Sequence, residues 1–135
     1  MIEVYIDGAS KGNPGPSGAG IFIKGIEKPV FLSKPLGVMS NHEAEYEALL
    51  AALNYCLAHH YMVISVRTDS QLVERAIENK HVKNKTFSPL LQRALHLIEQ
   101  FDLFFLKWIP SQQNKVADKL ARKAILMNGR EETNA

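Results

Sequence analysis

The spacing of hydrophobic residues changes along the chain, from alternation near its start to a helical period later. Ile2, Val4 and Ile6 alternate with other side chains, which predicts a strand with two different faces. Two more strands are predicted over 20–24 and 30–32, with a turn between them. The segment GASKGNPGPSG is crowded with Gly, Pro, Asn and Ser, which predicts a turn after the first strand. Short connections favour antiparallel neighbours, so we expect a three-stranded meander.

Helical spacing begins after Ser40, which together with Glu43 three residues later resembles a capping box. The apolar face of this helix is expected at Tyr46, Leu49, Leu50, Leu53 and Leu57. The remaining predicted elements are, in chain order, a strand over 63–68, a helix over 71–79, a helix over 88–98 capped by Ser88 with Pro89 in its first turn, a strand over 103–109, and a helix over 114–127 that Gly129 ends.

This order of elements predicts an α/β fold. The strand after the first long helix can return parallel to the first strand through a right-handed crossover. The result is a mixed sheet with helices on its faces. We expect one domain over residues 1–128 and a disordered tail over 129–135.

The composition is that of a soluble globular protein and leaves the partner open. The chain has 135 residues, of which 46% are hydrophobic and 22% charged, as is ordinary for one domain. It has no apolar run of about 18 residues and no recognisable signal peptide, so we expect a cytoplasmic protein without a membrane span. Its one cysteine, Cys56, excludes an internal disulfide and is expected to be buried. The formal net charge of +2 neither requires nor excludes nucleic acid.

Four acidic residues fall close to the boundaries or on the flanking helices of the predicted sheet. Asp7 ends the first strand, Asp69 follows the strand over 63–68, and Glu45 and Asp118 lie in the first and last long helices. Sites in open α/β sheets gather outside the carboxyl ends of parallel strands. Carboxylates packed together repel one another and need cations, and hard oxygen ligands suit Mg²⁺ or Mn²⁺. Two such ions about 4 Å apart can activate water and stabilise the leaving oxygen of a phosphodiester.

Each acid also has a purely structural interpretation. Asp7 precedes a glycine and is a possible turn residue, and Asp69 is a possible cap for the helix after it. Glu45 is one of three alternating glutamates in its helix, and spacing alone does not choose among them. Asp118 can pair with Arg122 on the same helix face.

Four segments resemble the signature segments of the ribonuclease H family, in that family's order: DGASKGNPGPSGAG, SNHEAEYEALLAAL, TDSQLV and NKVADKLAR. They extend from residue 7 to residue 122. The resemblance implies a five-stranded mixed sheet in the order 3-2-1-4-5 with flanking helices. It also implies an endonuclease that uses two divalent ions, Mg²⁺ or Mn²⁺, to cut the RNA strand of RNA–DNA hybrids, leaving 5′-phosphate and 3′-hydroxyl ends.

Carried over position by position, the resemblance assigns two sets of residues. The metal-binding and catalytic acids would be Asp7, Glu45, Asp69 and Asp118. The contacts to the hybrid would come from Asn13, Ser40, Asn41 and His42. Ser40 stands where the family often has a threonine that contacts a DNA-strand phosphate, and His42 replaces a more usual amide.

The chain departs from the family pattern in two places. Many members carry a histidine in the loop before the last acid, and short-loop members often have an arginine where this chain has Ser111. Here the loop, PSQQN, has neither. Some members also insert a basic helix and loop that grips DNA. This chain has instead a short basic connection of Lys80, His81, Lys83 and Lys85.

The sequence therefore leaves three functions open. The leading hypothesis is a ribonuclease H that acts on RNA–DNA hybrids and has no obligate protein partner. A non-catalytic nucleic-acid-binding domain on the same fold is favoured by the bare loop at Ser111, and the complete set of acids argues against it. A related nuclease that prefers double-stranded RNA, or a single ribonucleotide within DNA, is the third hypothesis.

Overall fold

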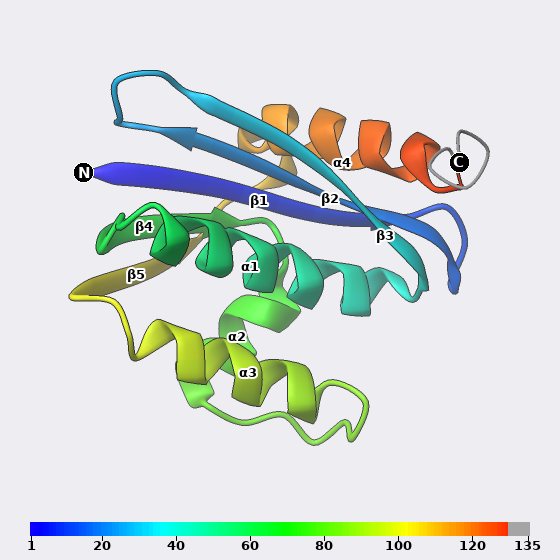
Figure 1. Ribbon diagram of the computed structural model, residues 1–135. Coiled ribbons are helices and arrows are strands. Elements are labelled where there is room, and N and C mark those ends of the chain that lie inside the picture. The colour runs from blue at the N-terminus through cyan, green and yellow to red at the C-terminus, as the bar shows by residue number, and fades with distance from the viewer. Residues whose placement is uncertain (130–135) are drawn as a thin grey trace.

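Five strands form one mixed sheet in the computed structural model, which describes residues 1–129 (Figure 1). Their order across the sheet is β3-β2-β1-β4-β5. The antiparallel part consists of β1 (Ile2–Ser10), β2 (Gly15–Lys24) and β3 (Val30–Met39). The parallel part adds β4 (Val63–Thr68) beside β1, and β5 (Leu103–Trp108) beside β4. The predicted α/β fold and its strand order are confirmed.

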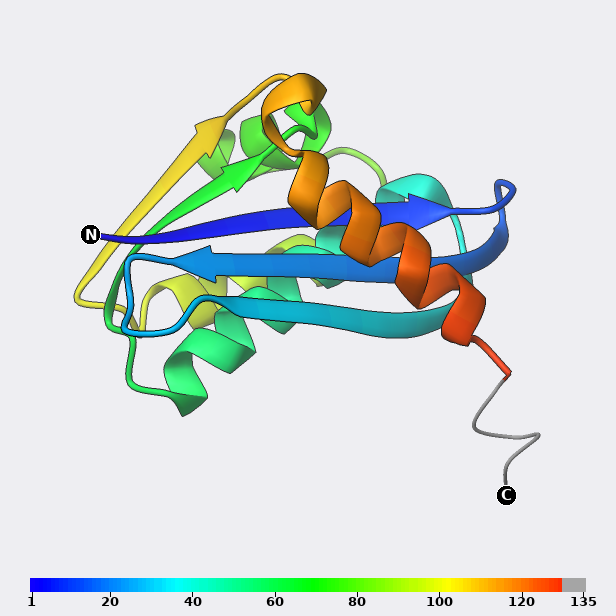
Figure 2. The same ribbon diagram turned by 90° about the horizontal axis from the view of Figure 1, so that it is seen from above.

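Helices cover both faces of this sheet. One face carries α4 (Lys115–Met127) alone, and the other carries α1 (Asn41–Ala58), with α2 (Gln71–Asn79) and α3 (Ser88–Ile98) beyond it (Figures 1 and 2). A short 3₁₀ turn (Ser111–Gln113) leads from β5 into α4. The chain passes from the antiparallel meander through α1 and returns in β4 parallel to β1, as predicted.

The main hydrophobic core lies between the sheet and α1. Val4, Ile6 and Ile64 on the strands are almost completely buried, as are Leu49 and Leu53 on the helix. Burial of one such side chain contributes about 1.5–3 kcal/mol relative to its exposure. The core therefore holds α1 firmly against β1 and β4, the two strands whose ends carry acids.

The other helix, α4, approaches the sheet unusually closely because small residues face one another. A Cβ atom on Gly20 of β2 would lie 2.0 Å from the carbonyl oxygen of Ala117, and one on Gly18 would lie 2.4 Å from that of Ala121. Both alanines are fully buried. This contact fixes the height of α4 above β1 and β2, and with it the position of Asp118.

All three strands of the meander are longer than predicted. The expected end of β1 at Asp7 is wrong, because β1 continues to Ser10 and pairs there with the early part of β2. The predicted start of β2 and the predicted end of β3 are also wrong, because β2 begins at Gly15 and β3 ends at Met39. Both added segments contain the Gly, Pro and Ser residues that had suggested turns. Gly18, which lies in the segment predicted as a turn, is instead a strand residue packed closely against α4.

The helix boundaries agree better with the sequence. The capping box at Ser40 is confirmed, with the serine hydroxyl accepting from the Glu43 N–H and the Glu43 carboxylate accepting from the Ser40 N–H. The predicted cap at Ser88 is wrong, because Ser88 is already helical and the capping residue is Phe87, without a side-chain bond. The last helix begins at Lys115, one residue later than predicted. The predicted tail lies outside the described residues from residue 130 onward.

The structure also bears on two predictions that were made from composition. Cys56 is fully buried, as expected, and burial raises the pKa of its thiol to about 12. None of the helices within residues 1–129 has the length and apolar character needed to cross a membrane. The cytoplasmic location stays a prediction.

The contact between Gly20 and Ala117 yields a test of the fold. We expect Gly20→Ala to lower stability by about 1–3 kcal/mol or more, because a methyl group must push backbone away from backbone. Thermal unfolding measures the loss. Ser33→Ala is the control, since it removes only the hydrogen bond from the Ser33 hydroxyl to the Leu120 carbonyl of the same helix. A Gly20→Ala protein as stable as the parent would contradict the close approach.

Candidate metal centre and nucleic-acid interface

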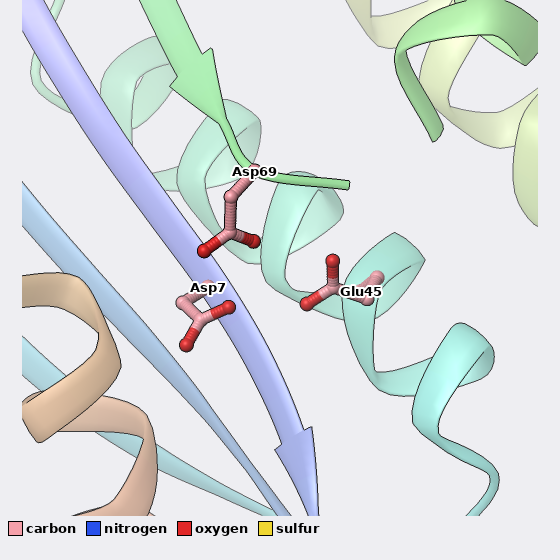
Figure 3. Close-up of side chains that lie close together, drawn as sticks. All are labelled: Asp7, Glu45 and Asp69. Atoms are coloured by element: carbon pink, nitrogen blue, oxygen red, sulfur yellow. The ribbon is translucent and has the colours of Figure 1, made fainter. Parts of the chain in front are cut away.

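Three carboxylates converge at one edge of the sheet. Asp7 comes from β1, Glu45 from α1, and Asp69 from the residue just after β4. One carboxylate oxygen from each residue lies within 4.8 Å of the others, and Figure 3 shows the three side chains pointing toward one another. Asp7 and Glu45 are buried and Asp69 is half-buried. The sequence-based grouping of these three acids is therefore matched by their geometry.

The fold explains why these acids meet. β1 and β4 run parallel and pair Ile6 with Thr68, so the next residue on each strand is an acid at the same edge. Glu45 reaches this edge from α1, and its carboxylate accepts a hydrogen bond of 2.8 Å from the Gly8 N–H. A Cβ on Gly8 would lie 2.2 Å from the Ala44 carbonyl oxygen. Glycine at this position is what allows α1 to approach β1 so closely.

The structure also distinguishes Glu45 from its two neighbours in α1. Glu43 is occupied in the capping box with Ser40. The Glu47 carboxylate lies 3.9 Å from the Arg93 guanidinium, on another side of the helix. Of the three glutamates, only Glu45 takes part in the acid cluster.

The negative charge of the cluster is not balanced by a lysine or arginine of residues 1–129. Within residues 1–129, neither lysine nor arginine forms an ion pair with Asp7, Glu45 or Asp69. Burial raises the pKa of Asp7 to about 10, and the negative charges of Glu45 and Asp69 act in the same direction. Burial raises the pKa of Glu45 to about 7, opposed by the hydrogen bond from Gly8. A bound divalent cation would remove this conflict, and three carboxylates are a suitable donor set for Mg²⁺ or Mn²⁺.

The fourth predicted acid, Asp118, lies apart from the other three. It projects from the first turn of α4, its side chain is 36% exposed, and its carboxylate lies 3.2 Å from the Arg122 guanidinium. The helix-surface pair suggested by the sequence is thus present. Asp118 nevertheless lines the same cavity as the other acids, and its negative charge contributes to raising the pKa of Asp7. Its role as a metal ligand stays a prediction.

The four acids line an open cavity of about 550 Å³. Asn41 and His42, at the start of α1, line this cavity together with Gln71 and Trp108. The cavity is therefore bordered by polar and aromatic side chains of the kinds that contact nucleic acids.

The four predicted contact residues lie along one rim of this cavity or next to it. Asn41 and His42 line it directly, and the exposed His42 ring stands edge-on to the Phe87 ring at 5.9 Å. The Asn13 side-chain carbonyl accepts a hydrogen bond of 3.0 Å from the Asn41 N–H. Ser40 caps the same helix. The structure brings the residues together, and their contact with a substrate stays a prediction.

Three residues that the sequence did not single out complete the surroundings of Asp69. The Ser70 hydroxyl caps α2 by accepting from the Val73 N–H. The Trp108 indole N–H donates to the Asp69 carbonyl oxygen at 3.1 Å. Asn114 is almost fully buried, and its amide N–H lies 3.4 Å from the Asp69 carboxylate. Ser70 and Asn114 stand within TDSQLV and NKVAD, which gave them no role, and Trp108 lies outside both segments.

The residues at the two places where the chain departs from the family pattern are exposed. Ser111 begins the 3₁₀ turn, is exposed, and does not line the cavity of the acids. Lys80, His81, Lys83 and Lys85 are all exposed in the connection between α2 and α3.

Comparison with known proteins decides the family. A family model described as "Reverse transcriptase-like" matches residues 5–124. Ribonuclease H1 from the archaeon Halobacterium salinarum has a crystal structure that is 35% identical to this chain, with a TM-score of 0.86, and the match covers 92% of this chain and 96% of that one. The chain belongs to the ribonuclease H family.

Two further relatives extend the comparison. EbsB of Enterococcus faecalis, which is named as a hydrolase, is 39% identical over 93% of this chain and 94% of its own length. LC11-RNase H1, solved in complex with an RNA/DNA hybrid, is 32% identical with a TM-score of 0.83, and the match covers 93% of this chain and 96% of that one. The full-length Halobacterium ribonuclease HI is longer than this chain, which spans 64% of it at 34% identity. The predicted family, fold and ribonuclease H enzyme class are confirmed.

The buried acids lead to a prediction about stability and pH. In the unfolded chain, Asp7 ionises near pH 4, whereas in the metal-free folded protein its pKa is about 10. Between these values the folded state binds more protons than the unfolded state, so stability falls as pH rises. We expect the stability of Asp7→Asn to fall less steeply as pH rises. Without metal, its melting temperature at about pH 8 should be higher than that of the parent.

The same experiment includes its own control. Addition of Mg²⁺ or Mn²⁺ should raise the melting temperature of the parent more than that of Asp7→Asn, because the parent has the charge that the ion compensates. Glu27→Gln, on an exposed residue outside the cluster, should behave like the parent. A metal-free Asp7→Asn protein less stable than the parent at this pH would contradict the electrostatic account.

Proposed function

We propose that this protein is a divalent-metal-dependent endonuclease that hydrolyses the RNA strand of RNA–DNA hybrids and leaves 5′-phosphate and 3′-hydroxyl ends. The observation that carries the proposal is the group of three carboxylates, within 4.8 Å of one another and without a cation partner among residues 1–129. Membership in the ribonuclease H family and the hybrid bound by LC11-RNase H1 support the choice of substrate.

The donor set fits a pair of Mg²⁺ or Mn²⁺ ions. Asp7, Glu45 and Asp69 would hold them, with Asp118 as the fourth ligand from the other side of the cavity. When bound, such ions lower the pKa of water and compensate negative charge on phosphate oxygens. In the hydrolysis, a water oxygen bonds to phosphorus and the bond from phosphorus to the 3′-oxygen breaks. The 3′-oxygen takes up a proton, which gives the two proposed ends.

The start of α1 is suited to hold the substrate. The Ser40 hydroxyl accepts a hydrogen bond from the Glu43 N–H, which leaves its own O–H proton free to donate to a phosphate oxygen of the DNA strand. Capping and phosphate binding are therefore compatible roles for this one side chain. Asn13 steadies the backbone of Asn41, so that Asn41 and His42 present polar groups beside Glu45.

The form of this interface predicts what kind of specificity it has. Side chains on a shallow surface can contact 2′-hydroxyls and base edges in the minor groove of a hybrid, and 2′-hydroxyls distinguish RNA from DNA. Contacts to phosphates and sugars carry no direct sequence information. The enzyme should therefore recognise strand chemistry and show little sequence preference.

One observation favours a second candidate, a weakly active or non-catalytic nucleic-acid-binding domain. Ser111 is exposed and is not among the residues that line the cavity, and the turn that it begins has neither histidine nor arginine. A serine hydroxyl has no positive charge and is a poor proton carrier at neutral pH. The acid cluster argues for the first candidate, because a binding domain has no need to bury uncompensated carboxylates.

Cleavage of an end-labelled hybrid, with Mg²⁺ and Mn²⁺ in parallel, tests the proposal at the three glutamates. We expect Glu45→Gln to abolish cleavage, because it removes a charge that faces Asp7 and Asp69. Glu43→Gln and Glu47→Gln are the matched controls and should cleave at nearly the parent rate. Double-stranded RNA and DNA carrying a single ribonucleotide serve as competing substrates.

The outcomes separate the candidate functions. Faster cleavage of double-stranded RNA or of the single-ribonucleotide substrate would replace the hybrid as the proposed substrate. A parent protein that binds hybrid but cuts none of the substrates with either metal would establish the binding domain. Loss of activity at Glu43 or Glu47, with Glu45→Gln active, would contradict the assignment of the acids.

The exposed loop gives a prediction about rate. A positioned proton-transferring group commonly contributes about 10²-fold or more, so we expect slow turnover by the parent, more evident with Mn²⁺ than with Mg²⁺. Ser111→Arg or Ser111→His should raise kcat. Gln113→Arg, in the same exposed turn, is the control and should have a smaller effect. A fast parent enzyme whose rate is unchanged by Ser111→Ala would show that this position is irrelevant to catalysis.

A further inference from the structure

Asn114 has an unusual environment for the residue that begins a helix. It is the N-cap of α4 and only 1% exposed. Asparagine is favoured at such positions because its side chain can accept a hydrogen bond from the first turn. Here the side chain makes no capping bond. It points instead into the interior, toward the sheet and the acids.

The amide group of Asn114 joins two parts of the candidate site. Its Nδ2 donates to the Ile6 carbonyl oxygen at 2.8 Å, in the residue before Asp7, and lies 3.4 Å from Oδ2 of Asp69. The Ile6 carbonyl oxygen can only accept a hydrogen bond, which fixes the side of the amide that carries the NH₂ group. The amide oxygen is buried and finds no partner in the described part of the chain. Leaving a buried oxygen without a hydrogen-bond partner costs free energy. The contacts of the NH₂ group are therefore the interactions that favour asparagine at this position.

The backbone of Asn114 adds a third connection. Its carbonyl oxygen accepts the Asp118 N–H at 3.0 Å, and its N–H donates to the Ser111 carbonyl oxygen, also at 3.0 Å. One residue thus links the strand that carries Asp7, the carboxylate of Asp69 and the turn of α4 that carries Asp118.

We propose that Asn114 is a positioning residue for the metal centre, which orients the Asp69 carboxylate and fixes α4, with Asp118, relative to Asp7. The proposal rests on the proposed function of the same site. Asn114 is too buried to contact a substrate directly. It acts by limiting the arrangements open to the ligands, as outer-shell partners of metal ligands do.

The opposite end of α4 provides a matched control. Asn128 also ties this helix to the sheet, because its Nδ2 donates to the Ser17 carbonyl oxygen at 2.7 Å and its Oδ1 accepts from the Gly37 N–H at 2.8 Å. It has the same side chain and belongs to the same helix, but it contacts none of the acids. Asn128→Ala therefore measures how much stability is lost when α4 is attached less firmly and the surroundings of the acids are unchanged.

The experiment compares Asn114→Ala and Asn128→Ala with the parent. Free Mn²⁺ is titrated by electron paramagnetic resonance to obtain the affinity of each protein for the metal, and kcat and KM are measured on the hybrid. We expect Asn114→Ala to bind Mn²⁺ about 10–100-fold more weakly and to lose kcat by a similar factor, with KM unchanged. Asn128→Ala should lower the melting temperature without changing Mn²⁺ affinity or kcat.

Equal effects of the two substitutions on Mn²⁺ affinity would overturn the proposal, as would an Asn114→Ala protein with the parent's affinity. If Asn114→Ala does not fold, Asn114→Ser takes its place, because serine is polar but its short hydroxyl replaces the amide NH₂ group. Failure of both variants to fold would make Asn114 a structural residue and would also overturn it. If the parent cuts no hybrid, the proposed function fails, but the comparison of Mn²⁺ affinities still decides the role of Asn114.

Discussion

Asp7 and Asp69 meet because β1 and β4 run side by side in the same direction, and the rest of the candidate site depends on this pairing. Parallel strands bring their carboxyl ends to one edge, and the register of Ile6 with Thr68 places the next two residues together. α1 can add Glu45 only because Gly8 leaves space for its backbone. α4 approaches from the other face through the contact of Gly20 with Ala117. Each helix is thus positioned by a glycine in a strand.

Burying these acids close together lowers the stability of the metal-free protein, and this cost indicates that the acids serve a function. Burial and mutual repulsion raise the pKa values of Asp7, Glu45 and Asp69, so the metal-free protein loses stability as these groups ionise. A chain under selection for stability alone would replace such residues or pair them with lysine or arginine. Asp118 lies outside this buried group, since its side chain is partly exposed and pairs with Arg122. The uncompensated charge is concentrated where a divalent cation would bind.

The sequence predicted the features that depend on local pattern and missed those that depend on tertiary packing. The bounds of β4 and α2 agree fully with prediction, because the β-branched run of β4 is a local signal. The cap of α2 is Ser70, and not Asp69 as the sequence had suggested. The extensions of β1, β2 and β3 were missed because their glycines and prolines resemble turn residues. Local spacing could not choose Glu45 among three glutamates, and the choice came from family resemblance. Nothing local distinguished Asn114, whose partners lie 45 and 108 positions away.

The side chain of Asp118 is held weakly, whereas the backbone of its helix is held firmly. An exposed ion pair four residues apart on a helix contributes only about 0.3–0.5 kcal/mol, so the pair with Arg122 offers little resistance to a turn of the Asp118 side chain toward a cation in the cavity. The backbone of α4 is held much more firmly, by Gly20 against Ala117 and by Asn114 at its start. A firmly held helix with a weakly held side chain suits the role proposed for Asp118, that of a ligand which completes the metal centre when the ions and substrate arrive. The three inner acids, by contrast, are held by β1, by the end of β4 and by α1 before any ion binds.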